Sequence, residues 1–200
     1  MAALRLVSLA LLAVLCAQAA PADAQDCPTA KTGRTGFIVE RDGRSKTEVT
    51  HVGDDLVLTV LRQDGKTLLE TTQFRGLLQL DRLEDGRKTI YRAQHNLATL
   101  FPLKPGEQKV AKFDVEERNS PLTRLDILLA VQEAADLSIG PCKYRVLKIE
   151  RKQSYREASP RFVNFDYYAP DLKLIIGKEY KERDGRMNLI KFDRIYAVKR

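Results

Sequence analysis

The amino-acid sequence predicts a single all-β domain, an antiparallel meander of about 10–12 strands with little helix. Segments of alternating or β-branched composition follow one another at short intervals, and four Asp-Gly pairs separate them. Asp-Gly is typical of tight hairpin turns, because both residues adopt positive φ at little cost. The pairs are Asp42-Gly43, Asp64-Gly65, Asp85-Gly86 and Asp184-Gly185. Strand order and shear are not encoded in local patterns, so the meander is compatible with a half-barrel, a barrel or a two-layer sandwich.

The domain is expected to occupy residues 25–200, because residues 1–24 predict a secretory signal peptide. The stretch from Leu6 to Ala17 is almost wholly apolar, and residues 22–24 (Ala-Asp-Ala) match the small-x-small cleavage pattern. The apolar run is shorter than the roughly 20 residues that cross a bilayer, so the protein is not expected to be transmembrane. Two alternatives are cleavage after Ala19 and acylation of Cys16 as a lipoprotein. We therefore expect a periplasmic or secreted protein, cleaved near Ala24.

Cleavage leaves two cysteines, Cys27 and Cys142, in a compartment where thiols are oxidised. We expect them to form a disulfide that ties the N-terminus to the start of a late strand. The alternative is a pair of free thiols. A metal site is less favoured, since the only two histidines, His51 and His95, show no ligand spacing with the cysteines.

The first half of the chain predicts six closely spaced strands. They fall near residues 35–41, 45–52, 55–62, 66–74, 77–83 and 86–92. Residues 56–61 are apolar on both faces, which predicts a central strand buried on two sides. Residues 93–107 contain Pro102 and Pro105-Gly106 and predict a loop or a single helical turn that covers one end of the sheet.

Strands resume at 108–117, where Ala111, Phe113 and Val115 alternate with charged residues. Residues 122–134 fit either a strand or a helix face, and we favour the strand. Further strands are expected near 142–152, 161–168, 172–182 and 186–198.

The sequence shows no catalytic constellation, so we predict a protein that is not an enzyme and has no cofactor, metal or catalytic residue. Neither histidine lies in a nucleophile motif. Cys142 is expected to be oxidised rather than nucleophilic. The acidic residues at 81, 84 and 85 alternate with basic ones, which indicates a solvated hairpin end rather than a calcium loop. A cleft that gathers distant acids, histidine or tyrosine is the less favoured alternative.

The formal net charge is +7, and all of the excess lies at the C-terminal end, where residues 143–200 contain 16 basic and 8 acidic residues. Basic residues near aromatic ones there predict an anion-binding surface. Its candidate residues are Arg151, Lys152, Arg156, Arg161, Lys178, Lys181, Arg183 and Arg186. The alternative is a solvated strand face whose aromatic neighbours point into the core. The export signal disfavours nucleic acid as the partner and favours lipid head groups, lipopolysaccharide or acidic glycans.

Three segments carry a resemblance to known proteins: residues 140–149 (GPCKYRVLKI), 167–180 (YYAPDLKLIIGKEY) and 101–106 (FPLKPG). They resemble uncharacterised exported proteins of Gram-negative bacteria, in which a cysteine-bearing strand is followed by an aromatic strand and a proline turn. The resemblance implies a curved antiparallel sheet, open along one side and broadly similar to the lipoprotein-carrier half-barrels. In such a sheet the concave face can hold an acyl chain. Carrier proteins usually have helices over the cavity, which this sequence does not predict, so no ligand residues are carried over.

Two functions follow as expectations. The first is a non-enzymatic envelope protein whose sheet binds a hydrophobic or anionic component, such as a lipid, lipopolysaccharide or an acidic glycan, or another envelope protein. The second is a structural or interaction module of the envelope with no small ligand. A wide apolar cavity would favour the first, whereas a filled concave face with an exposed patch or unpaired edge would favour the second.

Overall fold

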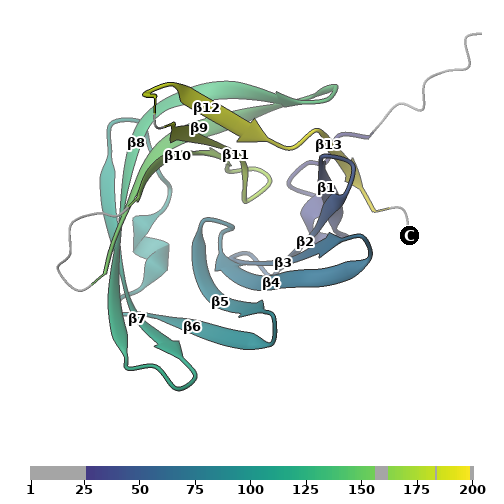
Figure 1. Cartoon of the computed structure of the whole chain (residues 1–200). Coiled ribbons are helices and arrows are strands. Elements are labelled where there is room, and N and C mark those ends of the chain that lie inside the picture. The colour runs from purple at the N-terminus through teal and green to yellow at the C-terminus, as the bar shows by residue number, and fades with distance from the viewer. Residues whose placement is uncertain (1–25, 156–161, 183, 199–200) are drawn as a thin grey trace, which may run out of the picture.

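The computed structural model describes residues 26–155, 162–182 and 184–198 (Figure 1). In these residues 13 antiparallel strands form one sheet in the order β12-β11-β10-β9-β8-β7-β6-β5-β4-β3-β2-β1-β13. The strands are β1 (Phe37–Arg41), β2 (Ser45–Val52), β3 (Leu56–Gln63), β4 (Lys66–Phe74), β5 (Leu78–Glu84), β6 (Arg87–Ala93), β7 (Gln108–Glu117), β8 (Thr123–Ile139), β9 (Cys142–Tyr155), β10 (Phe162–Ala169), β11 (Leu174–Lys181), β12 (Met187–Lys191) and β13 (Arg194–Ala197). The same residues contain two short 3₁₀ helices, η1 (Thr32–Arg34) and η2 (Leu97–Leu100), and no α-helix.

The predicted all-β meander is confirmed, and its shape is a single curved sheet around a hollow (Figure 1), which excludes the two-layer sandwich. The sheet is not closed into a barrel. The segment 122–134 belongs to the long strand β8, so the strand interpretation is correct there. The segment 93–107 contains η2, the expected helical turn. The predicted signal peptide, including Cys16, lies outside the described residues.

Three of the four Asp-Gly pairs form the expected turns, in which both residues have positive φ. At the fourth pair only Gly185 has positive φ. There β11 and β12 are joined by a longer loop, in which the Glu182 amide donates to the Arg186 carbonyl at 2.7 Å. A two-residue turn is therefore the wrong prediction at Asp184-Gly185, because the strand pairing ends earlier, at Lys181 and Met187.

The expected strand 186–198 is divided at Phe192 and Asp193 into β12 and β13, which are the two edges of the sheet. At the division, Asp193 forms hydrogen bonds with β1 and with the β1–β2 turn, at the other end of the strand order from β12. Its amide donates to the Glu40 carbonyl at 2.8 Å, and its carboxylate accepts from the Asp42 amide at 2.7 Å. The chain thus crosses from one edge of the sheet to the other within two residues.

The strand β3 is central in the sheet, between β2 and β4, but it is not buried on both faces. Val57 and Thr59 face the interior and are buried, whereas Leu58 on the outer face is 39% exposed. The prediction of two-sided burial is wrong here because among the described residues no second layer covers the convex face.

Two apolar clusters fill part of the concave side. Core 1 consists of Phe37, Val39, Val49, Val57, Leu137, Ile139, Cys142, Tyr144, Val146, Ala169, Leu172, Leu174, Ile176 and Ile195. Core 2 consists of Leu77, Leu78, Leu97, Leu100, Leu103, Ala111, Phe113, Leu125, Ile127, Leu129, Val131, Leu147, Ile149 and Tyr168. Core 1 joins the first and last strands to the tip of the β8–β9 hairpin, and core 2 lies beneath η2 and the middle strands.

The turns of a meander alternate between its two ends, and the turns at one end contact one another across the hollow. The His51 Nε2 lies 2.9 Å from the Leu172 carbonyl, and the Tyr168 hydroxyl donates to the Arg75 carbonyl at 2.7 Å. Lys173 donates to the Asp54 carbonyl. We call this end the base. The opposite end, formed by the β1–β2, β3–β4, β5–β6, β7–β8 and β11–β12 turns, is the rim, so the fold is a cup.

Gly76 is the tightest contact in the base and provides a test of it. A Cβ atom at this position would lie 1.5 Å from the Lys173 carbonyl oxygen, and Gly76 has a φ of +65°. We expect Gly76→Ala to lower the free energy of unfolding by about 2–3 kcal/mol, measured by urea denaturation. Gly86→Ala is the matched control, since Gly86 has a φ of +73° and nothing within 4 Å of its Cβ position. Equal losses of stability for the two substitutions would show that the close contact between Gly76 and Lys173 does not contribute to the effect.

Candidate functional site

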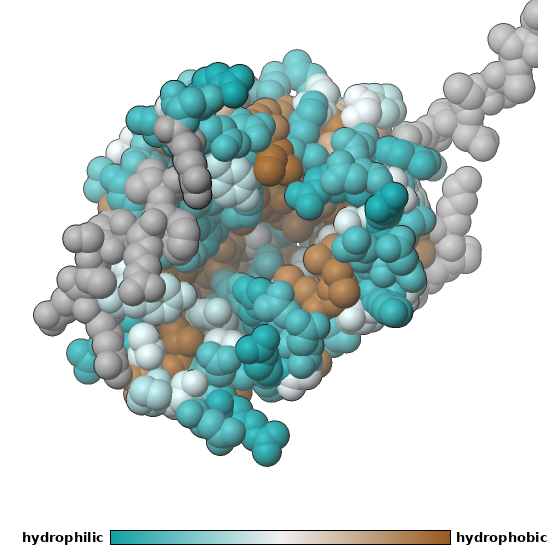
Figure 2. Space-filling view, in the orientation of Figure 1, coloured by the Kyte–Doolittle hydropathy of each residue, from teal (hydrophilic) through white to brown (hydrophobic). Residues whose placement is uncertain are grey.

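Two adjoining cavities lie on the concave side of the cup. The apolar cavity has a volume of about 460 Å³ and lies between β2–β4 and β11–β12. The cationic cavity has a volume of about 670 Å³ and extends to β5, β6, β8, β9 and β10. The two share the lining residues Gln73, Gln79, Ile175, Lys178 and Tyr180. Figure 2 shows the hollow, with apolar residues inside it and hydrophilic residues around it.

Strand alternation accounts for the part of the apolar cavity's lining that comes from β2, β3 and β4, because every second residue of a strand points to the concave face. On β11 the consecutive residues 174–178 line the cavity, opposite the register shift between Tyr167 and Tyr168. The cavity's apolar residues are Leu61, Leu69, Leu174, Ile175, Ile176, Ile190 and Phe192. Thr59 and Thr71 face each other across β3 and β4, and their hydroxyls are 2.7 Å apart. One hydroxyl donates to the other, and Gln73 Nε2 donates to Thr71 Oγ1 at 3.1 Å, so this part of the wall is uncharged and hydrogen-bonded within the protein.

A buried carboxylate, Asp166 on β10, organises the boundary between the two cavities. It is fully buried, and Arg151 Nε donates to its Oδ2 at 2.5 Å. Lys178 Nζ donates to its Oδ1 at 2.7 Å, and Asn164 Nδ2 to the same oxygen at 3.1 Å. Burial raises the pKa of Asp166, but the charges of Arg151 and Lys178 outweigh it and hold the pKa below its usual value. The carboxylate therefore remains charged, and one anion faces two cations.

All the charged residues that line the cationic cavity are positive. Its charged residues among those described are Arg82, Arg151, Lys178 and Lys181, with no carboxylate among them. Arg82 donates to Glu84 at 2.5 Å, whereas Lys181 has no ion pair within the described residues. Gln79 Nε2 is buried without a hydrogen-bond partner in the same part of the chain. A positive wall with a spare donor suits an anionic group.

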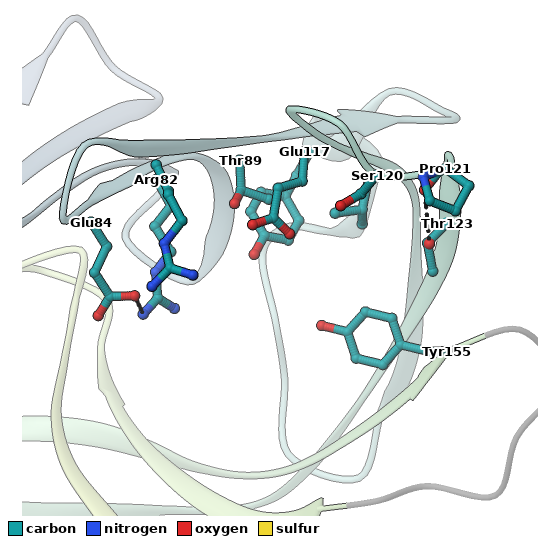
Figure 3. A pocket seen from close by; sticks show the side chains of 11 residues that line it. Arg82, Glu84, Thr89, Glu117, Ser120, Pro121, Thr123 and Tyr155 are labelled. Carbon is teal, nitrogen blue, oxygen red and sulfur yellow. Dashed lines mark hydrogen bonds and ion pairs between the residues drawn. The ribbon is translucent and has the colours of Figure 1, made fainter.

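A third pocket, of about 460 Å³, continues the cationic cavity to the rim between the β5–β6 and β7–β8 turns. Arg82, Tyr91 and Tyr155 line both. Figure 3 shows Tyr155 on one side of this pocket and the Arg82–Glu84 pair on the other. Burial, followed by the nearby Tyr155, raises the pKa of Tyr91, so its hydroxyl stays protonated and can donate. Because this pocket shares three lining residues with the cationic cavity, it extends the interior to the rim.

The predicted basic residues are divided among several places. Arg151, Lys178 and Lys181 line the cationic cavity together. Lys152 lies on the opposite face of β9 and pairs with Glu150 at 3.0 Å. Arg186 pairs with Asp184 in the β11–β12 turn. The remaining three predicted residues, Arg156, Arg161 and Arg183, lie outside the described residues.

Sequence analysis missed Asp166, Gln79 and Arg82. Asp166 had a visible signal, since it is a lone acid in the aromatic strand FVNFDYY. The other two are polar residues three positions apart on β5, which simple alternation would place on opposite faces. The register between β4 and β5 shifts between Thr72 and Gln73, and both residues line the cationic cavity.

The other residues weighed as functional have structural roles in the described part of the chain. Cys142 forms the predicted disulfide with Cys27, with an S–S distance of 2.04 Å. His51 is buried in the base, where burial lowers its pKa although the Leu172 carbonyl raises it. Within this part of the chain no three His, Cys, Asp or Glu residues are grouped as a metal site would require. No helix found there has the length and apolar character needed to cross a membrane.

No protein-family model and no curated protein sequence matches this chain. Among solved structures it is similar to the hypothetical lipoprotein YmcC from Escherichia coli K12, with a TM-score of 0.47, 10% identity, and coverage of 78% of this chain and 86% of that one. It is also similar to a protein of Bacteroides fragilis described as exported and as having a YmcC-like fold, with a TM-score of 0.44, 11% identity, and coverage of 81% and 95%. Both are similarities of fold alone.

Proposed function

We propose that the protein is a non-enzymatic binding protein of the cell envelope, and that its cup holds an envelope component with an apolar chain. The observation that carries the proposal is the apolar cavity of about 460 Å³, which lies on the concave face and is not filled by the protein's own side chains. Small-molecule sites are usually concave, mostly apolar and about 300–1,000 Å³ in volume.

The two cores support this proposal because they form the floor of the cavity without filling it: Leu174 and Ile176 of core 1 belong to its lining. Most of the cavity lining comes from five strands, β2, β3 and β4 on one side and β11 and β12 on the other, so the cavity spans the two edges of the sheet. The signal peptide predicted from residues 1–24 would deliver the chain to the envelope. The Cys27–Cys142 disulfide fits the same compartment, since such bonds persist where thiols are oxidised.

Binding of an uncharged apolar dye tests the proposal. We expect N-phenylnaphthylamine to show a saturable rise in fluorescence with the purified protein. Thr47 lines the apolar cavity, and Thr47→Trp would place an indole in it, so we expect dye affinity to fall by about tenfold or more. Thr72 lies on the opposite face of β4 from the lining residue Thr71, so Thr72→Trp is the matched control and should leave dye affinity unchanged.

The chain has no native tryptophan, so the emission of each introduced indole also reports whether the variant is folded. Absence of saturable dye binding to the wild-type protein would contradict the proposal, as would equal effects of the two substitutions. Native mass spectrometry of the protein purified gently from its own envelope would then identify the apolar component that it carries.

A second candidate function is an interaction module that binds another envelope protein. It is favoured by β12, an edge strand on which all five residues are exposed, including the apolar Met187, Leu189 and Ile190. Exposed edge strands are templates for pairing with another chain. Co-purification of a protein with an otherwise empty cup would favour this function over the first.

A further inference from the structure

We infer that the ligand of the cup is an anionic amphiphile, whose phosphate or carboxylate group binds in the cationic cavity while its apolar chain occupies the apolar cavity. The inference rests on the proposed function and adds the chemical class of the ligand. Its binding residues are Arg151, Lys178 and Lys181, with Gln79 and Arg82 completing the lining.

The two cavities are positioned for one ligand rather than two. Gln79 and Lys178 belong to the lining of both, so the apolar part and the charged part adjoin at these side chains. Tyr180 lies on the same boundary. A molecule with one apolar end and one charged end matches this division, whereas an uncharged hydrocarbon would leave the excess positive charge of the cationic cavity unmatched.

The charge of the cavity selects the sign of the polar end. Arg151 and Lys178 share a single carboxylate, Asp166, and this cluster therefore has one positive charge in excess. Arg151 is only 7% exposed, so water screens its charge poorly. Lys181 adds a further positive charge to the same wall. Two acids, Glu84 and Glu117, line the rim pocket, and Glu84 is already paired with Arg82.

Residues that line this space have donors without partners in the described part of the chain. Of the five N–H donors of a guanidinium, the structure pairs only those on Nε and Nη2 of Arg151 within the described residues. Gln79 Nε2 also has no partner there. A buried donor that makes no hydrogen bond is costly, and an oxygen of a phosphate or carboxylate would satisfy it. Asp166 holds both cations in place before the ligand binds, so their geometry is preorganised.

Calorimetric titration with dodecyl phosphate, below its micelle concentration, tests the inference directly. We expect it to bind about tenfold or more tightly than dodecyltrimethylammonium, which has the same chain and the opposite charge. Inorganic phosphate alone is the third arm. Binding of dodecyl phosphate without measurable binding of inorganic phosphate supports an amphiphile, whereas equal binding of the two would show a site for a free anion and contradict the amphiphile.

Three substitutions locate the site. Lys181→Gln removes an exposed cation without an ion pair in the described chain and should fold normally, and Lys178→Gln removes a cation that touches Asp166. We expect Lys178→Gln to lower the affinity for dodecyl phosphate by about tenfold, and Lys181→Gln to lower it by a smaller factor. Lys152→Gln, on the convex face of β9, is the control and should change nothing. If neither Lys178→Gln nor Lys181→Gln changes the affinity for dodecyl phosphate, the proposed site is wrong.

The titration separates this inference from the proposed function. If the apolar dye binds but the phosphate and ammonium detergents bind equally, the cup is an apolar site and the anionic class is wrong. If the dye does not bind but dodecyl phosphate binds in a manner dependent on Lys178, the apolar cavity is wrong and the anion site stands. Failure of both dye and dodecyl phosphate to bind overturns both.

Discussion

Substitution of Asp166 by asparagine is expected to lower the free energy of unfolding by about 3 kcal/mol, because it leaves the buried Arg151 and the partly exposed Lys178 without their carboxylate. Arg151 and Lys178 are held by this side chain at 2.5 and 2.7 Å. The amide has nearly the same shape as the carboxylate, so the loss would be electrostatic and not the result of a cavity. The measurement is urea denaturation near neutral pH, with circular dichroism to confirm that the variant is folded.

Asp136 on β8 provides a matched control. It also pairs with two cations, Lys143 at 2.9 Å and Arg145 at 3.6 Å, but its side chain is 41% exposed. Solvent screens such pairs, so Asp136→Asn should change stability far less. Similar losses for the two variants would show that burial of Asp166 is not what makes its ion pairs important.

The stability difference between wild-type protein and Asp166→Asn should also depend on pH. The pKa of Asp166 is lower in the folded protein than its usual value near 3.8. A carboxyl with a lowered pKa stabilises the folded state above its unfolded pKa, and this contribution is lost as the pH falls below it. The two unfolding free energies should therefore converge as the pH falls below about 4. A difference that stays constant as the pH falls further below about 4 would contradict the charge assignment.

The sequence predicts most strands because their signals are local. Asp-Gly pairs and alternating residues act over two to ten residues, and β3, β4, β5 and β6 fall where those signals place them. The pairing of β1 with β13 is different, since Phe37 pairs with Ala197 across almost the whole chain. No local pattern encodes it. The division at Asp193 likewise depends on hydrogen bonds to Glu40 and Asp42, which only the folded sheet brings near.

The candidate site could be predicted only in part, for a related reason. Alternation along β9 separates Arg151 from Lys152, but it does not tell which face of the sheet is concave. Sheet curvature decides that Arg151, Lys178 and Lys181 share a cavity and that Lys152 does not. Charge counting points to the C-terminal end of the chain and cannot identify Asp166, whose ion pair depends on register with Lys178 across β10 and β11.

Removal of the Cys27–Cys142 disulfide, by serine at both positions, is expected to lower the free energy of unfolding by about 4 kcal/mol. The bond joins residues 115 apart in sequence. Such a long closure restricts the unfolded chain strongly, and its loss makes the unfolded state more favourable. Urea denaturation of the double variant, compared with the wild-type protein under non-reducing conditions, measures the change. A loss below about 1 kcal/mol would contradict this account, as it would mean that native strain cancels the closure entropy.

Two further samples separate the bond from the packing of Cys142, which is 1% exposed in core 1. Wild-type protein reduced with dithiothreitol lacks the bond but keeps both sulfurs, and the double alanine variant lacks the polar hydroxyls of serine. If the bond is responsible, all three samples should lose similar stability. The hairpin tip that holds Cys142 also touches the strand crossing, since Lys191 donates to the Ser138 carbonyl at 2.8 Å. Loss of the bond should therefore speed hydrogen exchange first at β13 and the β8–β9 tip, while exchange in core 2 stays unchanged.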